Sequence, residues 1–136
     1  MNIIHLLTPK SETAYIHDDY SLRQALEKMK YHGYRSIPVI SKSGKYIGTI
    51  SEGDFLWFLL IENENEVVHT DIRNIENLSV RDILDTAKYP SVPVTASREK
   101  VFEMAMQQNF IPVVDDRGFF MGIITRQAIM TDIKSK

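Results

Sequence analysis

The chain has 136 residues, of which 43% are hydrophobic and 25% are charged, a composition typical of a globular protein large enough to bury its own core. Its net charge of -2 gives no electrostatic reason to expect nucleic acid or an anionic membrane as a partner. The absence of cysteine excludes disulfides, thiolate metal sites and cysteine nucleophiles. Residues 1–9 lack the Lys or Arg of a signal peptide and the longest apolar run, 55–61, is too short to span a bilayer, so we expect a cytoplasmic protein.

The first half of the chain predicts five elements. Ser21 and Gln24, just ahead of an apolar stripe, have the capping-box pattern that begins a helix. Two β-branched runs joined by the turn residues 41–44 have the pattern of a hairpin. The expected elements are a strand at 13–16, a helix from 21 to 33, strands at 37–40 and 46–50, and a helix at 51–61.

The second half predicts the same five elements after a polar connector at 62–78, which is expected to be solvated. Ser79 is placed to cap a short additional helix, and Ser97 to cap the first main helix of this half. The expected elements are a strand at 91–95, a helix from 97, strands at 111–114 and 119–124, and a helix from 125.

The two halves repeat one sequence pattern. Residues 36–54 align with 110–128 at a constant offset of 74, which pairs Pro38 with Pro112; upstream of the hairpins the offset is 76. Each copy is too small to bury its own apolar face, so the two are expected to pack on each other and to leave a groove suited to a ligand. We therefore expect one domain made of a first motif at 8–61 and a second at 79–134.

Motifs of catalysis are absent from the sequence. It has no phosphate-binding Gly-x-x-x-x-Gly-Lys loop, no Gly-x-Gly-x-x-Gly and no Gly-x-Ser-x-Gly. The four histidines are widely spaced and form no metal-ligand pattern. We expect neither an enzyme nor a metal site.

The junctions between the last strand and the last helix of each copy carry the strongest chemical signal. Ser51 and Asp54 combine a hydroxyl with a carboxylate at a helix start, where a phosphate and two ribose hydroxyls would be bound. The alternative is that Ser51 is only a helix cap and Asp54 only complements the helix dipole. The equivalent position in the second copy keeps a hydroxyl, Thr125, and adds a cation, Arg126, which favours a phosphate site.

The twin units, with Ile-Pro-Val at 37–39 and 111–113 followed by Gly48-Thr-Ile-Ser51 and Gly122-Ile-Ile-Thr125, resemble a CBS domain pair over residues 8–134. The resemblance implies an α/β fold of tandem motifs, each strand-helix-strand-strand-helix, packed with pseudo-twofold symmetry. It implies a cleft on either side, which in many members binds an adenine nucleotide. Ser51 and Thr125 would then contact phosphate and Asp54 would contact ribose, whereas Ala128 replaces the second ribose ligand.

The resemblance also implies which residues hold the base. They belong to the short first strand and the Ile-Pro-Val strand of each motif: Thr13, Ala14, Tyr15, Ile37 and Pro38 in the first, and Ser91, Val92, Ile111 and Pro112 in the second. For Ile37 and Ile111, packing in the core is an alternative role. Lys10, Arg35 and Ser36 could each reach a phosphate, and the alternative for Lys10 and Arg35 is a solvated surface side chain.

Within that family the chain is similar to small stand-alone proteins that bind cyclic di-AMP. The similarity lies in Gly33-Tyr34-x-x-Ile37-Pro38-Val39 and in Thr125-Arg126. A ligand with two phosphates would use Arg126 and would not need a carboxylate at position 128. The ligand is thus expected to be cyclic di-AMP or AMP, ADP or ATP, with no other cofactor.

The run Phe55–Ile61 is apolar around a full helical turn, and one face has no partner inside so small a unit. We expect a homodimer through the helices that follow the hairpins, with Trp57 or Phe58 near the contact, and a separate effector protein. The alternative is a constitutive dimeric interaction protein with vestigial clefts. A nucleotide-processing enzyme is disfavoured by the missing motifs, and nucleic-acid binding by the acidic charge.

Overall fold

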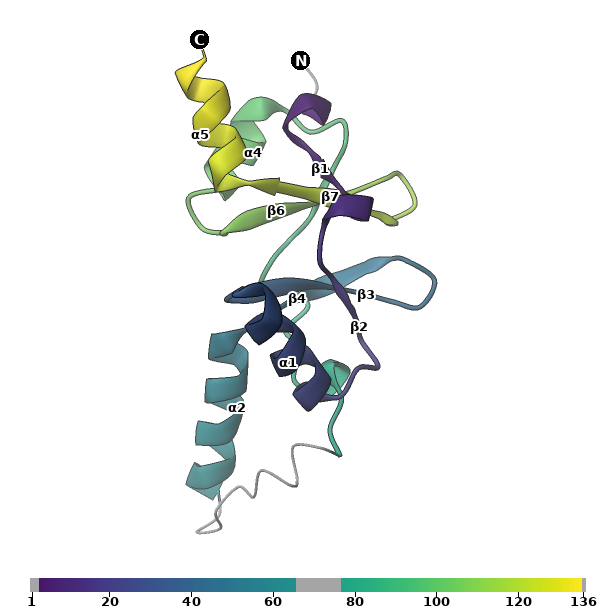
Figure 1. The fold of residues 1–136 in the computed structure, drawn as a ribbon, viewed down its shortest axis with the longest axis vertical. Coiled ribbons are helices and arrows are strands. Elements are labelled where there is room, and N and C mark those ends of the chain that lie inside the picture. The colour runs from purple at the N-terminus through teal and green to yellow at the C-terminus, as the bar shows by residue number, and fades with distance from the viewer. Residues whose placement is uncertain (1–2, 66–76, 136) are drawn as a thin grey trace.

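The computed structural model describes residues 3–65 and 77–135, which form two stacked motifs of the same element order (Figure 1). This arrangement confirms the expected α/β fold of tandem motifs. The first motif contains β2 (Ile16–His17), α1 (Leu22–His32), β3 (Ser36–Ile40), β4 (Tyr46–Ser51) and α2 (Glu52–Asn65). The second contains β5 (Val92–Pro93), α4 (Arg98–Met104), β6 (Phe110–Val114), β7 (Phe120–Thr125) and α5 (Arg126–Lys134). Short segments precede each motif: η1 (Ile4–Leu6), β1 (Thr8–Pro9) and η2 (Lys10–Glu12) before the first, and η3 (Val80–Asp82) before the second.

In each motif a central strand pairs on one side with a short parallel strand and on the other side with its antiparallel hairpin partner. β3 is central in the first sheet and β6 in the second, and β2 and β5 enter in the same register, at Val39 and Val113. The strand predicted at 13–16 is misplaced, because the backbone of Lys10–Thr13 forms a 3-10 turn and pairing begins only at Ile16. The strand predicted at 91–95 is shortened to β5, because the backbone N–H of Ala96 turns back to the carbonyl of Pro93.

The predicted helix starts are confirmed by their caps. Ser21 accepts from the backbone N–H of Gln24 at 3.0 Å, and the Gln24 side chain accepts from the N–H of Ser21 at 2.9 Å. Ser97 and Thr125 cap α4 and α5 in the same way, with one accepted hydrogen bond each. At Ser79, however, only the single 3-10 turn η3 forms. The helix α2 continues to Asn65, and the predicted connector beyond it lies mostly outside the described residues.

The segments that precede the motifs are exchanged between the two sheets. β1 lies antiparallel to β7 and so extends the sheet of the second motif, as Figure 1 shows. Ile3 and Leu6, just before it, are buried in the second core. Conversely, Val80, just before the second motif, is buried in the core of the first. Each core is therefore completed by the segment that precedes the other motif.

Two equivalent glycines make room for this exchange. A Cβ at Gly122, whose φ is +149°, would overlap the carbonyl oxygen of Thr8 and stand 3.0 Å from the Cα of Pro9 in β1. At Gly48, the equivalent position of the first motif, an added Cβ would lie 3.3 Å from the side chain of Leu84. The close approach of β1 therefore requires glycine at position 122, whereas the contact at Gly48 is with a side chain that can shift.

The hairpins meet across a pseudo-twofold axis. The backbone N–H of Tyr46 donates to the carbonyl of Gly118 at 3.1 Å, and that of Phe120 donates to the carbonyl of Gly44 at 2.9 Å. These two bonds are images of each other under the repeat offset of 74. The rings of Tyr46 and Phe120 stack with their centres 6.2 Å apart. This symmetric contact confirms the predicted packing with pseudo-twofold symmetry.

Candidate functional site

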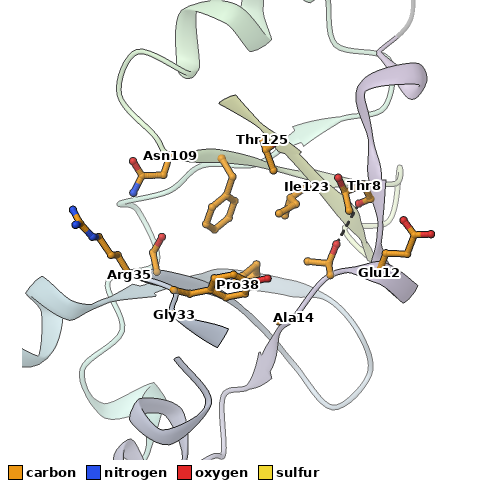
Figure 2. A pocket seen from close by; sticks show the side chains of 13 residues that line it. Thr8, Glu12, Ala14, Gly33, Arg35, Pro38, Asn109, Ile123 and Thr125 are labelled. Atoms are coloured by element: carbon orange, nitrogen blue, oxygen red, sulfur yellow. Dashed lines mark hydrogen bonds between the residues drawn. The ribbon is translucent and has the colours of Figure 1, made fainter. Parts of the chain in front are cut away.

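A cavity of about 520 Å³ opens between the two motifs on one side of the hairpin contact (Figure 2). Both motifs and the segment before the first contribute to its wall. Six of the residues singled out in the sequence line it together: Thr13, Ala14, Arg35, Ser36, Pro38 and Thr125. The other lining residues are Thr8, Glu12, Gly33, Tyr34, Asn109, Phe110 and Ile123.

The cavity is apolar in its middle and polar at its ends. Pro38 and Ile123 face each other across the centre, while Arg35 and Asn109 lie at one end and Thr8 and Glu12 at the other (Figure 2). Such a distribution suits a flat apolar ring between the sheets, with an anionic group at the arginine end. Arg35 makes no ion pair within the described residues, so its charge is available to a ligand.

Thr125 brings a hydroxyl and a helix start to the cavity. Its Oγ1 accepts the N–H of Ala128 at 3.0 Å, which leaves the hydroxyl proton free to be donated to a ligand oxygen. The N-terminus of α5 adds the partial positive charge of its unpaired N–H groups. The absence of a carboxylate at Ala128 removes the acceptor that ribose hydroxyls would use at this place.

Arg126 does not line the cavity, and two hydrogen bonds hold its side chain. Its Nε donates to the carbonyl of Ala105 at 2.8 Å, and its Nη1 donates to Oδ1 of Asn109 at 3.1 Å. Asn109 itself lines the cavity, so the Arg126 charge is placed next to the arginine end. Two cations, Arg35 and Arg126, therefore flank one end of the site.

Other predicted residues lie away from this cavity. Lys10 sits over the ring of Tyr15, 5.4 Å from its centre, and the carbonyl of Tyr15 accepts from Lys28 at 2.6 Å. Ile37, Ile111 and Val92 are almost completely buried in the two hydrophobic cores, which is the alternative role considered for the isoleucines. Ser91 is half-buried and Pro112 is buried, both in the second motif.

Ser51 and Asp54 form a second group on the opposite side of the hairpin contact. Asp54 Oδ2 accepts from the backbone N–H of Ser51 at 2.7 Å and from its hydroxyl at 3.1 Å. The ammonium of Lys88 donates to Ser51 Oγ at 2.7 Å and to Asp54 Oδ1 at 2.9 Å. Neither Ser51 nor Asp54 lines the 520 Å³ cavity, so the structure divides the predicted residues between two clefts.

Seven lining residues were not among the predicted site residues, and Glu12, Asn109 and Phe110 are three of them. Under the repeat offset of 74, Asn109 is the equivalent of Arg35 and Phe110 the equivalent of Ser36. Carrying each candidate from one copy to its equivalent in the other would have identified both. Glu12 precedes the first predicted strand, and no local pattern marks it.

Within the described ranges, no three His, Asp or Glu side chains are arranged to hold a metal ion. In the same part of the chain, no helix has the length and apolar character needed to cross a membrane.

Comparison with known proteins identifies the repeated unit. The family model for the CBS domain matches residues 5–61 and 80–135. Among curated relatives, the chain is 24% identical over 135 residues to an uncharacterized protein of Methanocaldococcus jannaschii, covering 82% of this chain and 80% of that protein. It is 28% identical over 117 residues to homoserine O-acetyltransferase of Methanohalophilus mahii, covering 84% of this chain but 21% of the transferase.

Two solved structures share the fold over nearly the whole chain. CbpB in complex with cyclic di-AMP superposes with a TM-score of 0.87 at 24% identity, covering 99% of this chain and 85% of CbpB. CBSX2 in complex with AMP superposes with a TM-score of 0.77 at 20% identity, covering 98% and 96%. With both motifs matched by the family model and both present in the structure, the chain belongs to the CBS domain family.

Proposed function

We propose that this chain is a regulatory module that binds an adenine nucleotide in the 520 Å³ cavity and transmits its occupancy to a separate partner protein. The observation that carries the proposal is one cavity that combines an apolar centre, the Thr125 hydroxyl in its wall and the charge of Arg35 at one end. The fold is shared with CbpB, solved with cyclic di-AMP, and with CBSX2, solved with AMP, and both ligands contain adenine.

The proposed ligand pose follows from the polarity of the cavity. The adenine ring lies between Ala14, Pro38 and Ile123, and a phosphate lies toward Arg35 and Thr125. The missing carboxylate at position 128 favours cyclic di-AMP over a mononucleotide. In a cyclic dinucleotide the 3′ oxygen is esterified, so each ribose has a single free hydroxyl and no need of an acceptor for two.

Thermal unfolding in the presence of single nucleotides tests the proposal. The panel is AMP, ADP, ATP, cyclic di-AMP, cyclic di-GMP and S-adenosylmethionine. A ligand at about 100 times its dissociation constant stabilises the fold by about 2.7 kcal/mol, which raises Tm by several degrees. A shift with adenine nucleotides alone supports the proposal. No shift across the panel, with a single clean transition, contradicts it.

Arg126 provides the sharper test of the phosphate end. A hydrogen bond to a charged group contributes about 1.5–3 kcal/mol, so Arg126→Ala is expected to weaken nucleotide binding about tenfold to a hundredfold in calorimetry. Arg117→Ala is the matched control, since Arg117 is an exposed arginine in the turn between β6 and β7. Equal affinity of the two variants would remove Arg126 from the site.

We also propose that the module is a cytoplasmic homodimer. Leu56 and Trp57 on α2 are 58% and 65% exposed, and Met130 on α5, the equivalent of Leu56, is 56% exposed. Apolar side chains at equivalent places on both helices are typical of an interface. Trp57→Asp is expected to give monomers in sedimentation velocity. Met106→Asp, at an apolar residue 82% exposed elsewhere, should leave the dimer intact; a dimeric Trp57→Asp would refute this interface.

The constitutive interaction protein remains as a second candidate because of one observation. The hydroxyl and carboxylate of the second cleft, Ser51 and Asp54, are already satisfied by Lys88. If the nucleotide panel gives no shift while the dimer persists, this second candidate is the better description.

A further inference from the structure

The two clefts carry different side chains at positions that the repeat makes equivalent. Under the upstream offset of 76, Glu12 and Thr13 of the first cleft correspond to Lys88 and Tyr89 of the second. Glu12 and Thr13 line the open cavity. Lys88 and Tyr89, here called the blocking pair, make contacts with the groups that would otherwise receive a ligand.

Lys88 occupies the polar end of the second cleft. Its ammonium lies 2.7 Å from the Ser51 hydroxyl oxygen and 2.9 Å from the Asp54 carboxylate. It therefore uses the two side chains that would contact a phosphate and a ribose, and it neutralises the carboxylate. A separate cavity beside Lys88 is lined by Asp54, Trp57 and Phe58 of α2 with Ile83, Asp85 and Lys88, and by no residue of β5 or β6.

Tyr89 is the second-motif equivalent of Thr13 under the offset of 76. Its side chain is 8% exposed and its ring lies 5.2 Å from that of Phe110, centre to centre. Its hydroxyl accepts the backbone N–H of Asn109 at 3.1 Å. The second motif therefore carries a large buried ring at the position where Thr13, a much smaller side chain, lines the open first cavity.

Two further residues hold Tyr89 in place. The hydroxyl of Tyr46 donates to the carbonyl of Tyr89 at 2.7 Å and lies 2.8 Å from the hydroxyl of Thr49. Burial raises the pKa of Tyr46 above its ordinary value, so this donor keeps its proton. The equivalents of Tyr46 and Thr49 in the second motif are Phe120 and Ile123, which have no polar atom to hold a backbone in this way.

We infer that Lys88 and Tyr89 exclude nucleotide from the second cleft, so that each chain binds one nucleotide, and that Ser51 and Asp54 form a latent site beneath them. The stoichiometry of one rests on the proposed function of the first cavity. The latent site does not, because it is built from different residues.

The test exchanges the distinguishing residues between the clefts. Lys88→Ala combined with Tyr89→Thr gives the second cleft the small side chain of the first, and Thr13→Tyr gives the first cleft the ring of the second. Calorimetry with AMP and with cyclic di-AMP measures the stoichiometry of each variant. Adding Asp54→Ala to the double variant shows whether any new binding uses the latent site. Urea unfolding establishes that each variant is folded.

The expected stoichiometries are one nucleotide per wild-type chain, two for the double variant, one again when Asp54→Ala is added, and none for Thr13→Tyr. Two nucleotides per wild-type chain, or one remaining on Thr13→Tyr, would overturn the inference even if the double variant did not fold. A folded double variant that binds no more than wild type would also overturn it. If the wild-type chain binds no nucleotide while the double variant binds one, the proposed function of the first cavity is refuted and the inference about the second cleft is not.

Discussion

Substitution of Gly122 by alanine should disrupt the exchange of segments, and the same change at Gly48 should not. At Gly122 the positive φ costs an alanine about 1–2 kcal/mol. The new Cβ also overlaps the Thr8 carbonyl oxygen, which is backbone and cannot rotate away. Separation of β1 from β7 to relieve that overlap adds about 2 kcal/mol in lost pairing and burial. The expected loss in free energy of unfolding is about 3–4 kcal/mol.

At Gly48 the obstacle is the far end of the Leu84 side chain, at 3.3–3.4 Å, which can shift by a few tenths of an ångström. The lower entropy of the unfolded chain offsets part of that strain, so the net change is expected to stay within about 1 kcal/mol. In thermal unfolding followed by circular dichroism, Gly122→Ala should lower Tm by about 10 °C and Gly48→Ala by about 3 °C or less. Equal losses for the two variants would show that the close approach of β1 is not what requires glycine at position 122.

Two further substitutions test the residues around the clefts. Tyr46→Phe removes the donor to the Tyr89 carbonyl, so urea unfolding should show a loss of about 1–2 kcal/mol; a loss below about 0.5 kcal/mol would mean that this hydrogen bond contributes little to folding. Thr125→Ala removes the cap of α5 and the hydroxyl in the cavity, and is expected to cost about 1 kcal/mol of stability together with nucleotide affinity. Thr125→Ser keeps both groups and should restore both quantities, and an affinity that stays low in Thr125→Ser would argue against a role for the hydroxyl.

The sequence predicts the elements whose signals are local. Capping side chains at Ser21, Ser97 and Thr125 mark helix starts correctly because the cap and its partner are only three residues apart. The exact bounds of the first strand in each motif are not predicted, because they depend on register with a strand farther along the chain, Ile16 with Val39 for example. The exchange of β1 is equally invisible, since a strand of two residues carries no periodicity.

The sequence predicts several residues of the candidate site but not which of them lie together in one cavity. Ala14, Pro38 and Thr125 were all singled out, and the structure brings them into one cavity from both motifs. Ser51 and Asp54 have the same sequence signal, yet they lie in the other cleft against Lys88. The difference arises because Ser51 and Asp54 follow β4 in the first motif and Thr125 follows β7 in the second, and the pseudo-twofold contact of the hairpins separates these two junctions.

The exchanged segments also bear on how such a repeat can arise. A single motif expressed alone would lack one wall of its core, because residues such as Ile3 and Leu6 pack on the other motif. Two separate copies of one motif could complete their cores if the N-terminal segment of each packed on the core of the other. Fusion of two such genes would then turn an exchange between molecules into one within a chain. By the same topology, proteolytic cleavage between the motifs would leave two fragments that remain interlocked as a complex.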